Sequence, residues 1–187
     1  LKGAKFSQVD FYKTHLFEKI LVFFGGVDPE NLTSLSINAI NNLCNEKLHV
    51  DVVVGTAHPY RHEIESVCKS LNYSCHVQTE RMAELMAESD LAIGAGGSAS
   101  WERCCLGLAT ISVAFADNQY AIAKQLDRVG ASIFLGNHHS VSQTKIEDAM
   151  SELILDRDRV KSMSSTAYSI VDGNGTKRVC EILNQFQ

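Results

Sequence analysis

Short, almost continuously apolar runs alternate along the chain with longer segments in which apolar positions recur at helical spacing. The six runs cover residues 20–24, 50–54, 74–77, 91–93, 110–115 and 132–135. Runs that are apolar throughout, rather than at every second position, predict strands that are covered on both faces, as in a parallel sheet. We therefore expect an α/β fold, a Rossmann-like doubly wound sheet of about six parallel strands.

Helical spacing between the runs predicts the helices. They cover residues 29–45, 59–71, 80–88, 98–106 and 119–129, and two or three more are expected after Ser142. Pro29 and Pro59 fall where a first helical turn tolerates proline, and Gly107 and Gly130 fall where helix C-caps are expected. Residues 1–18 have no clear period and are expected to be a connecting arm ahead of a domain at 19–187.

Composition narrows the class of protein. The 187 residues are 45% hydrophobic and 21% charged, as in a soluble globular domain. A net charge of -5 without a basic stripe argues against nucleic acid or an anionic membrane as partner. No apolar run approaches the roughly 20 residues of a membrane span, and no signal peptide is evident, so a cytoplasmic location is expected. Because the chain starts at Leu1, we also expect it to be a piece of a longer protein.

The six cysteines have no C-x-x-C spacing, and most lie inside apolar patterns. This pattern predicts reduced, buried thiols rather than a disulfide framework or a zinc site. No cofactor is expected.

The most informative stretch is 90–102, which reads D-L-A-I-G-A-G-G-S-A-S-W-E. An apolar run reaches Gly96 and Gly97 and then a helix start at Ser98, where unpaired amides and the helix dipole favour an anion such as phosphate. Glu102, one turn further on, could accept hydrogen bonds from a ribose diol. The alternative is a tight strand-to-helix turn that uses glycine for its backbone freedom.

A second glycine pair follows the first apolar run. Gly25 and Gly26 would let a ligand approach the backbone, and Asp28 is a candidate cap for the next helix. A structural turn is the alternative interpretation.

Two further loops carry candidate contacts. Asn118 and Gln119 could hydrogen-bond sugar hydroxyls, although Asp117 or Asn118 could instead be a helix N-cap. Backbone groups from Thr79 to Met82 could pair with a base edge, although periodicity alone shows only a loop there.

Other candidate sites have less support. His58 and His62 are four residues apart, but Pro59 leaves His58 outside the helix and no third ligand is evident, so no metal site is expected. His138 and His139 are expected in a solvated polar loop, from which one could be recruited to the ligand edge. Ser98 and Ser100 lack the G-x-S-x-G elbow of a serine hydrolase.

Five motifs together resemble the C-terminal half of the UDP-sugar hydrolase of pseudaminic acid biosynthesis, which acts on a UDP-linked 2,4-diacetamido-2,4,6-trideoxyhexose. They are G-G-V-D-P-E-N-L-T at 25–33, M-A-E-L-M-A-E-S-D-L-A-I at 82–93, G-A-G-G-S-A-S-W-E-R-C-C-L-G-L at 94–108, A-D-N-Q at 116–119 and D-G-N-G-T-K-R-V at 172–179. That family is related to the GT-B glycosyltransferases, including the lipid II-forming N-acetylglucosaminyltransferase, whose C-terminal Rossmann-like domain holds UDP.

The resemblance implies a role for each loop. Backbone groups near Thr79 to Met82 would meet uracil, Glu102 the ribose, the two glycine loops the diphosphate, and the amides after residue 117 the sugar. The implied UDP-sugar contacts are Gly25, Gly26, Asp28, Thr79, Met82, Gly96, Gly97, Ser98, Glu102, Asn118 and Gln119. Val27 stands where a serine is usual in the first loop, which removes one possible phosphate contact.

The resemblance also implies what the chain lacks. The family's general base is a histidine in a G-x-G-H-x-x-R loop of the N-terminal domain, and this sequence has no such motif. The chain is therefore expected to be inactive alone and to need its own N-terminal domain as partner. C-terminal helices that cross back onto that domain would leave apolar surface after Asp156, through which the fragment could self-associate. The donor domain of a GT-B glycosyltransferase and a nonenzymatic nucleotide-binding module are the alternatives.

Overall fold

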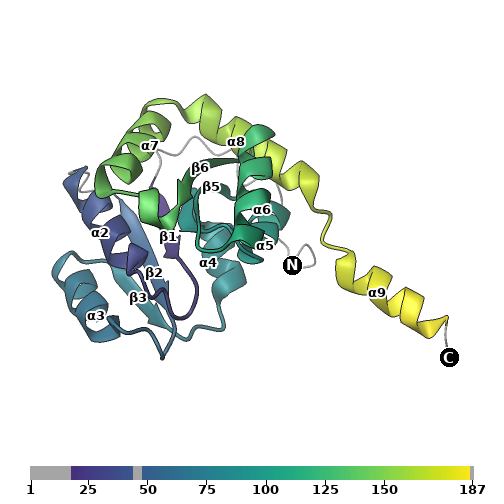
Figure 1. Cartoon of the computed structure of the whole chain (residues 1–187), viewed down its shortest axis with the longest axis horizontal. Coiled ribbons are helices and arrows are strands. Elements are labelled where there is room, and N and C mark those ends of the chain that lie inside the picture. Colours follow the sequence, from purple (N-terminus) through teal and green to yellow (C-terminus); the bar gives the residue numbers. More distant parts are fainter. Residues whose placement is uncertain (1–17, 44–47, 186–187) are drawn as a thin grey trace.

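The computed structural model describes residues 18–43 and 48–185, and the expected arm lies outside this range apart from Glu18. One sheet of six strands runs through the molecule in the order β3-β2-β1-β4-β5-β6 (Figure 1). All of its neighbouring strands are parallel, so the predicted doubly wound α/β fold is confirmed. The strands are β1 Lys19–Phe23, β2 His49–Val54, β3 Ser74–Val77, β4 Leu91–Ala95, β5 Ala109–Ala114 and β6 Ser132–Asn137.

The strand order reverses between β1 and β4. These two strands pair directly, with Phe23 opposite Gly94, whereas the chain proceeds from β1 toward β3 on one side and from β4 toward β6 on the other. The loops after β1 and β4 therefore leave the same edge of the sheet in opposite directions. Such a switch point opens a crevice at the carboxyl ends of the strands, where doubly wound sheets bind ligands.

Helices cover both faces of the sheet, as the continuously apolar strands require. One cluster of buried side chains joins β1, β2 and β5 to α2, α3 and α7. On the opposite face, α4, α5 and α6 contribute to two smaller clusters. The helices are α2 Leu32–Asn42, α3 Arg61–Ser70, α4 Met82–Glu88, α5 Ala99–Leu106, α6 Asp117–Arg128, α7 Gln143–Leu155, α8 Arg157–Ile170 and α9 Gly175–Asn184, with a short 3-10 helix η1 at His138–Ser140.

The placement of two prolines in first helical turns was wrong. Each proline is instead the second residue of a β-turn that precedes its helix, and these turns are closed by hydrogen bonds from Asn31 N to Asp28 O and from Arg61 N to His58 O. The fixed φ of proline suits that turn position as well as it suits a helix start. The prediction of C-caps was right: Gly107 ends α5 and Gly130 follows α6, both with positive φ.

The cysteines are mostly buried, as predicted. Cys68, Cys104 and Cys105 are buried, Cys75 is half-buried and Cys180 is exposed, and all five are free thiols. Cys44 lies outside the described residues.

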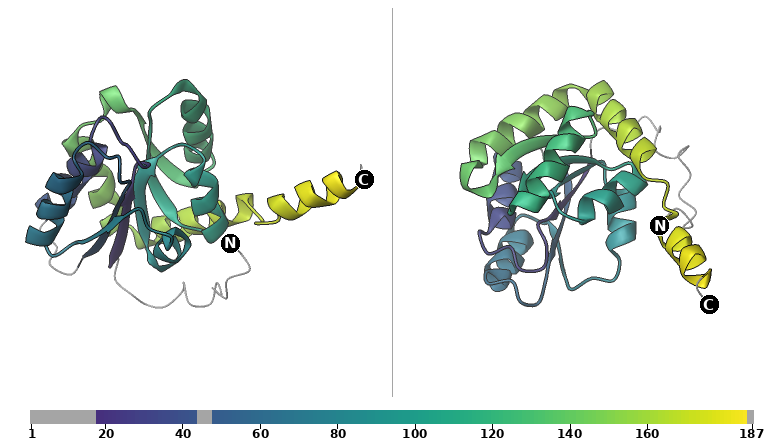
Figure 2. Two further views of the ribbon diagram at one scale, coloured as in Figure 1. Left: turned by 90° about the horizontal axis from the view of Figure 1, so that it is seen from below. Right: turned by 45° about the vertical axis from the view of Figure 1, so that its right-hand side comes forward.

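The segment after Asp156 divides into two parts. Helix α8 packs against α5 and β5 and buries Val160, Met163 and Ala167, so the expectation of exposed apolar surface was wrong for it. Helix α9 projects from the body of the domain, buries none of its residues and exposes Val179 and Ile182 (Figure 2). The expectation is confirmed for α9. No helix in the described part of the chain is long and apolar enough to cross a membrane.

Candidate functional site

The turn between β4 and α5 leaves backbone amides free at the switch point. Ser98 is at the N-cap position of α5, but its side chain makes no capping hydrogen bond. The first backbone hydrogen bond within the turn runs from Ser100 N to Gly97 O. Among the described residues, the amides of Gly97, Ser98 and Ala99 have no partner. Unpaired N–H groups at a helix N-terminus can bind an anion, and the contact of Gly96, Gly97 and Ser98 with a phosphate stays a prediction.

Close packing requires glycine at Gly94, near the end of β4, and at Gly96, in the turn that follows. A Cβ on Gly94 would overlap the carbonyl oxygen of Phe23 and lie 3.0 Å from Nη1 of Arg103. A Cβ on Gly96 would lie 2.8 Å from Cβ of Ala123 in α6. Both positions have negative φ, so the absence of space, and not backbone conformation, demands glycine here.

The β5–α6 loop joins this turn through Gln119. Its Oε1 accepts a hydrogen bond from the amide of Phe115 at 3.0 Å, and its Nε2 lies 3.3 Å from the position of a Cβ on Gly97. Neither Asp117 nor Asn118 is the N-cap, which was wrongly predicted: Ala116 takes that position, because Gln119 at the third helical position reaches back to the chain ahead of the helix. Asn118 is exposed beside it.

Glu102 meets the requirement of a ligand-binding carboxylate. It is exposed on α5, one turn from the free amides, and within the described chain it has no hydrogen bond or ion pair. Its role as the ribose contact stays a prediction.

In the turn between β1 and α2, a carboxylate of the chain itself accepts hydrogen bonds from the amides at the start of the helix. Asp28 is buried, and its oxygens accept hydrogen bonds from the amides of Leu32 and Thr33 at 3.1 and 2.7 Å and from the Thr33 hydroxyl at 2.7 Å. The predicted capping role is confirmed, although the N-cap position itself is taken by Asn31, whose side chain accepts a hydrogen bond from Ser34 N at 3.4 Å. Contact between Asp28 and a substrate stays a prediction, as do the contacts of Gly25 and Gly26.

Sequence reasoning missed two residues that brace this turn. Gly55, after β2, donates its amide to Gly26 O at 3.1 Å, and a Cβ on it would overlap that same residue. Nδ1 of the buried His58 accepts a hydrogen bond from the amide of Tyr60. A neutral ring in this arrangement carries its proton on Nε2. Nε2 lies 3.6 Å from Asp28 Oδ2. The sequence contains a signal for these two residues: the stretch G-T-A-H-P at 55–59 follows an apolar run directly, just as Gly25 and Gly26 do.

The two histidines weighed as metal ligands have other partners. His62 is exposed and faces Glu65 at 3.2 Å, while His58 lies against Asp28. Within the described ranges, no group of three or more His, Cys, Asp and Glu side chains could hold a metal ion.

The β3–α4 loop ends at Arg81, and Met82 is the first residue of α4. The Thr79 hydroxyl accepts the amide of Arg81 at 3.1 Å, which shapes the loop. The Met82 side chain packs against the buried cluster that includes Leu21 of β1 and Val53 of β2, so it fixes the start of α4 on this face of the sheet. Contact of the Thr79 to Met82 backbone with a base stays a prediction.

His138 differs from the expected solvated residue. Its side chain is only 11% exposed and its ring stacks on Phe115 at 5.3 Å, which in turn meets Phe24 edge-on at 6.2 Å. Nε2 of His138 lies 3.9 Å from Oε1 of Glu30. The cause is tertiary: β5, β6 and the end of β1 bring these rings together. His139 is exposed, as expected.

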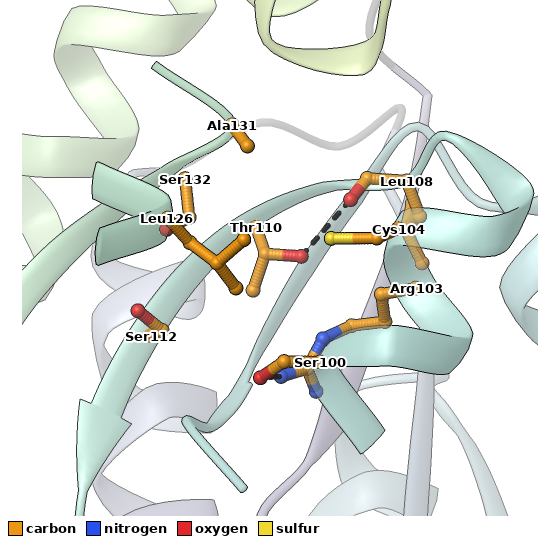
Figure 3. A pocket seen from close by; sticks show the side chains of 9 residues that line it. All are labelled: Ser100, Arg103, Cys104, Leu108, Thr110, Ser112, Leu126, Ala131 and Ser132. Atoms are coloured by element: carbon orange, nitrogen blue, oxygen red, sulfur yellow. Dashed lines mark hydrogen bonds between the residues drawn. The ribbon is translucent and has the colours of Figure 1, made fainter. Parts of the chain in front are cut away.

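Arg103 lies beneath the open turn and was not identified from the sequence. It is 2% exposed, and its Nη2 donates to Ala95 O at 2.6 Å and to Ser100 Oγ at 3.1 Å (Figure 3). Burial lowers the pKa of its guanidinium to about 10, so it stays charged at neutral pH. The adjoining cavity, which Thr110 and Ser132 help to line, measures only about 10 Å³, enough for one water molecule and far too small for a nucleotide.

The chain is similar to several known proteins over most of its length. It is 31% identical over 166 residues to the spore coat polysaccharide biosynthesis protein SpsG of Bacillus subtilis, a match that covers 88% of this chain and 49% of SpsG. In structure it is similar to MurG of Acinetobacter baumannii (TM-score 0.71, 19% identity, 90% of this chain and 52% of that one). It is also similar to the UDP-GlcNAc 2-epimerase of Neisseria meningitidis bound to UDP-GlcNAc (TM-score 0.70, 16% identity, 98% of this chain and 49% of that one).

The chain therefore spans about half the length of each of these three proteins. Residues 20–181 match the glycosyltransferase family 28 C-terminal domain, which is nearly the whole of the described structure. The chain belongs to the glycosyltransferase family 28 C-terminal domain family and has the Rossmann-like fold of the GT-B superfamily.

Proposed function

We propose that this chain is the nucleotide-binding half of an enzyme that cleaves a UDP-sugar at its anomeric carbon. The open turn at 97–99 carries the proposal, because its three unpaired amides lie at the switch point of the sheet. A diphosphate would supply the anion that this turn lacks.

The neighbouring loops would contact the rest of the substrate. Glu102 is exposed in the first turn of α5, close in sequence to the free amides, so its carboxylate would be available to the ribose of a nucleotide whose phosphates they bind. Gln119 bridges the open turn and the end of β5, which would put Asn118 on the sugar side. The backbone ahead of Met82 would take the uracil edge.

Our leading assignment is a hydrolase of a UDP-linked 2,4-diacetamido-2,4,6-trideoxyhexose, as the motif resemblance implies. Water would form a bond to the anomeric carbon, the bond from that carbon to the diphosphate oxygen would break, and UDP would leave with the electron pair. The described candidates for the base are engaged elsewhere: Asp28 caps α2, His58 is buried and His138 faces Glu30. We place the base in the N-terminal domain.

The second candidate is the donor domain of a UDP-sugar glycosyltransferase. The family match favours it, since it is to a glycosyltransferase domain, and SpsG is named for polysaccharide biosynthesis. The donor site would be the same, and a hydroxyl of an acceptor would attack in place of water.

Titration calorimetry of this chain with UDP, CMP and GDP tests the nucleotide site. We expect UDP to bind with roughly micromolar affinity, about -8 kcal/mol, and the other two nucleotides to bind more weakly. Absence of UDP binding up to millimolar concentration in a folded sample would refute the proposal.

Turnover distinguishes the two enzymes. The full-length protein should release UDP from the diacetamido sugar in buffer alone, whereas this chain should be slower by a factor on the order of 100 to 10,000 or more, because it lacks the general base. Release that requires an added acceptor would identify a transferase. Equal turnover by the chain alone would place the base in this domain.

A further inference from the structure

Arg103 is a buried cation for which the described chain supplies no anion. Its guanidinium is 2% exposed, its Nε has no hydrogen-bond partner, and its two bonds at Nη2 go to a carbonyl and a hydroxyl. Removal of an unpaired charge from water costs several kcal/mol, and proteins normally offset that cost with a carboxylate. The neighbouring acid Glu102 is exposed and makes no ion pair with it in the described structure.

The contacts of Arg103 enclose the open turn. Ala95, at the end of β4, and Ser100, in the first turn of α5, lie immediately before and after residues 96–99. Nη1 lies close to Gly94, where only the absence of a side chain leaves room for it. The guanidinium therefore hydrogen-bonds to a residue at each end of the turn, and Figure 3 shows its side chain beside Ser100.

We propose that Arg103 is a positioning residue for the diphosphate of the nucleotide, and that this diphosphate is the counter-ion its buried charge lacks. The inference rests on the proposed function. Arg103 would act through the turn: it holds the three amides in place and its field favours an anion above them.

A merely structural role predicts a different outcome. If Arg103 only stabilised the fold as a whole, its loss would weaken the binding of uridine, UMP and UDP alike or would only lower the free energy of unfolding. If its charge serves the diphosphate, the loss must grow with the number of phosphates on the ligand. Uridine, UMP and UDP form the series that separates these cases.

The test compares Arg103→Gln, Arg103→Lys and Ser100→Ala in NMR titrations with the three ligands. Arg103→Gln should weaken UDP binding by about 10- to 100-fold, the usual effect of losing an interaction with a charged group, weaken UMP less, and leave uridine unchanged. Arg103→Lys keeps the charge and should lose less than Arg103→Gln. Ser100→Ala is the matched control, which removes one hydrogen bond, keeps the charge and should retain the preference for UDP over uridine.

A measurement on the wild-type protein covers the case in which Arg103→Gln does not fold. The Nε–H signal of Arg103, assigned by its loss in Arg103→Lys, should shift with UDP and with inorganic pyrophosphate but not with uridine. The inference would be overturned if Arg103→Gln lost affinity for uridine and UDP equally. It would also be overturned if pyrophosphate did not shift the Nε–H signal of Arg103. If wild-type protein bound no UDP at all, the proposed function itself would fail.

Discussion

The two turns on either side of the switch point look alike in sequence and differ at their amides. The β1–α2 turn carries Asp28, whose buried carboxylate accepts the free amides at the start of α2. The β4–α5 turn has no acid of its own; its amides at 97–99 are open, and a buried cation lies beneath them. The start of α2 is thus capped by a carboxylate of the chain itself, whereas the start of α5 is left for an anion from outside the described chain.

The glycines of the two turns also differ in purpose. Gly25 has a φ of 98° and nothing within 4 Å of a Cβ placed on it, so it provides a backbone conformation. Gly94 and Gly96 have ordinary φ values and no room for a side chain. Glycine in the first turn permits a positive φ. Glycine at the end of β4 and in the second turn permits β4, Phe23 and α6 to pack closely.

Gly94→Ala should have the largest effect. The new Cβ would overlap the carbonyl of Phe23 and press on Arg103, so we expect a loss of about 4 kcal/mol or more in the free energy of unfolding, or no folding at all. Gly25→Ala is the matched control and should cost about 1 to 3 kcal/mol, since it meets only backbone strain. Urea denaturation measures both. Equal losses would mean that packing does not distinguish the two turns.

Asp28→Ala should be the next in size. It removes a buried cap and leaves two amides and the Thr33 hydroxyl without their acceptor, which should lower the free energy of unfolding by about 2 to 4 kcal/mol. Asp117→Ala, at the exposed first residue of α6, should change it by less than about 0.5 kcal/mol. A loss of UDP affinity in Asp28→Ala that exceeds its loss of stability would support direct contact with the substrate.

Glu102→Gln should have the smallest effect on the stability of the fold and a clear effect on the affinity for UDP. Loss of charge-assisted hydrogen bonds from the ribose should weaken UDP binding by about 1.5 to 3 kcal/mol while the free energy of unfolding stays within about 0.5 kcal/mol. Calorimetry and urea denaturation of the same preparation measure both. An unchanged dissociation constant would show that Glu102 is only a surface charge near the helix dipole.

Local pattern was enough to predict the sheet and the order of its elements. Each strand is a short apolar run and each helix shows its own spacing, so neither required knowledge of distant contacts. The boundaries were less accurate where turn chemistry intervened. Pro29 and Pro59 were assigned to helices that begin at Leu32 and Arg61, because proline suits both a turn and a helix start.

Sequence alone therefore determined the fold class, the position of both glycine turns and the family that their motifs resemble. Only the tertiary structure decided which turn is open, because that depends on where the carboxylate of Asp28 points and on what lies beneath residues 96–99. The burial of Arg103 and the stack of His138 on Phe115 likewise depend on strands and helices that are distant in the chain. The spacing of apolar residues along one segment predicts which face of that segment is buried. Whether a particular charged or polar side chain is buried, and which partner it has, depends on the residues that distant segments place against it.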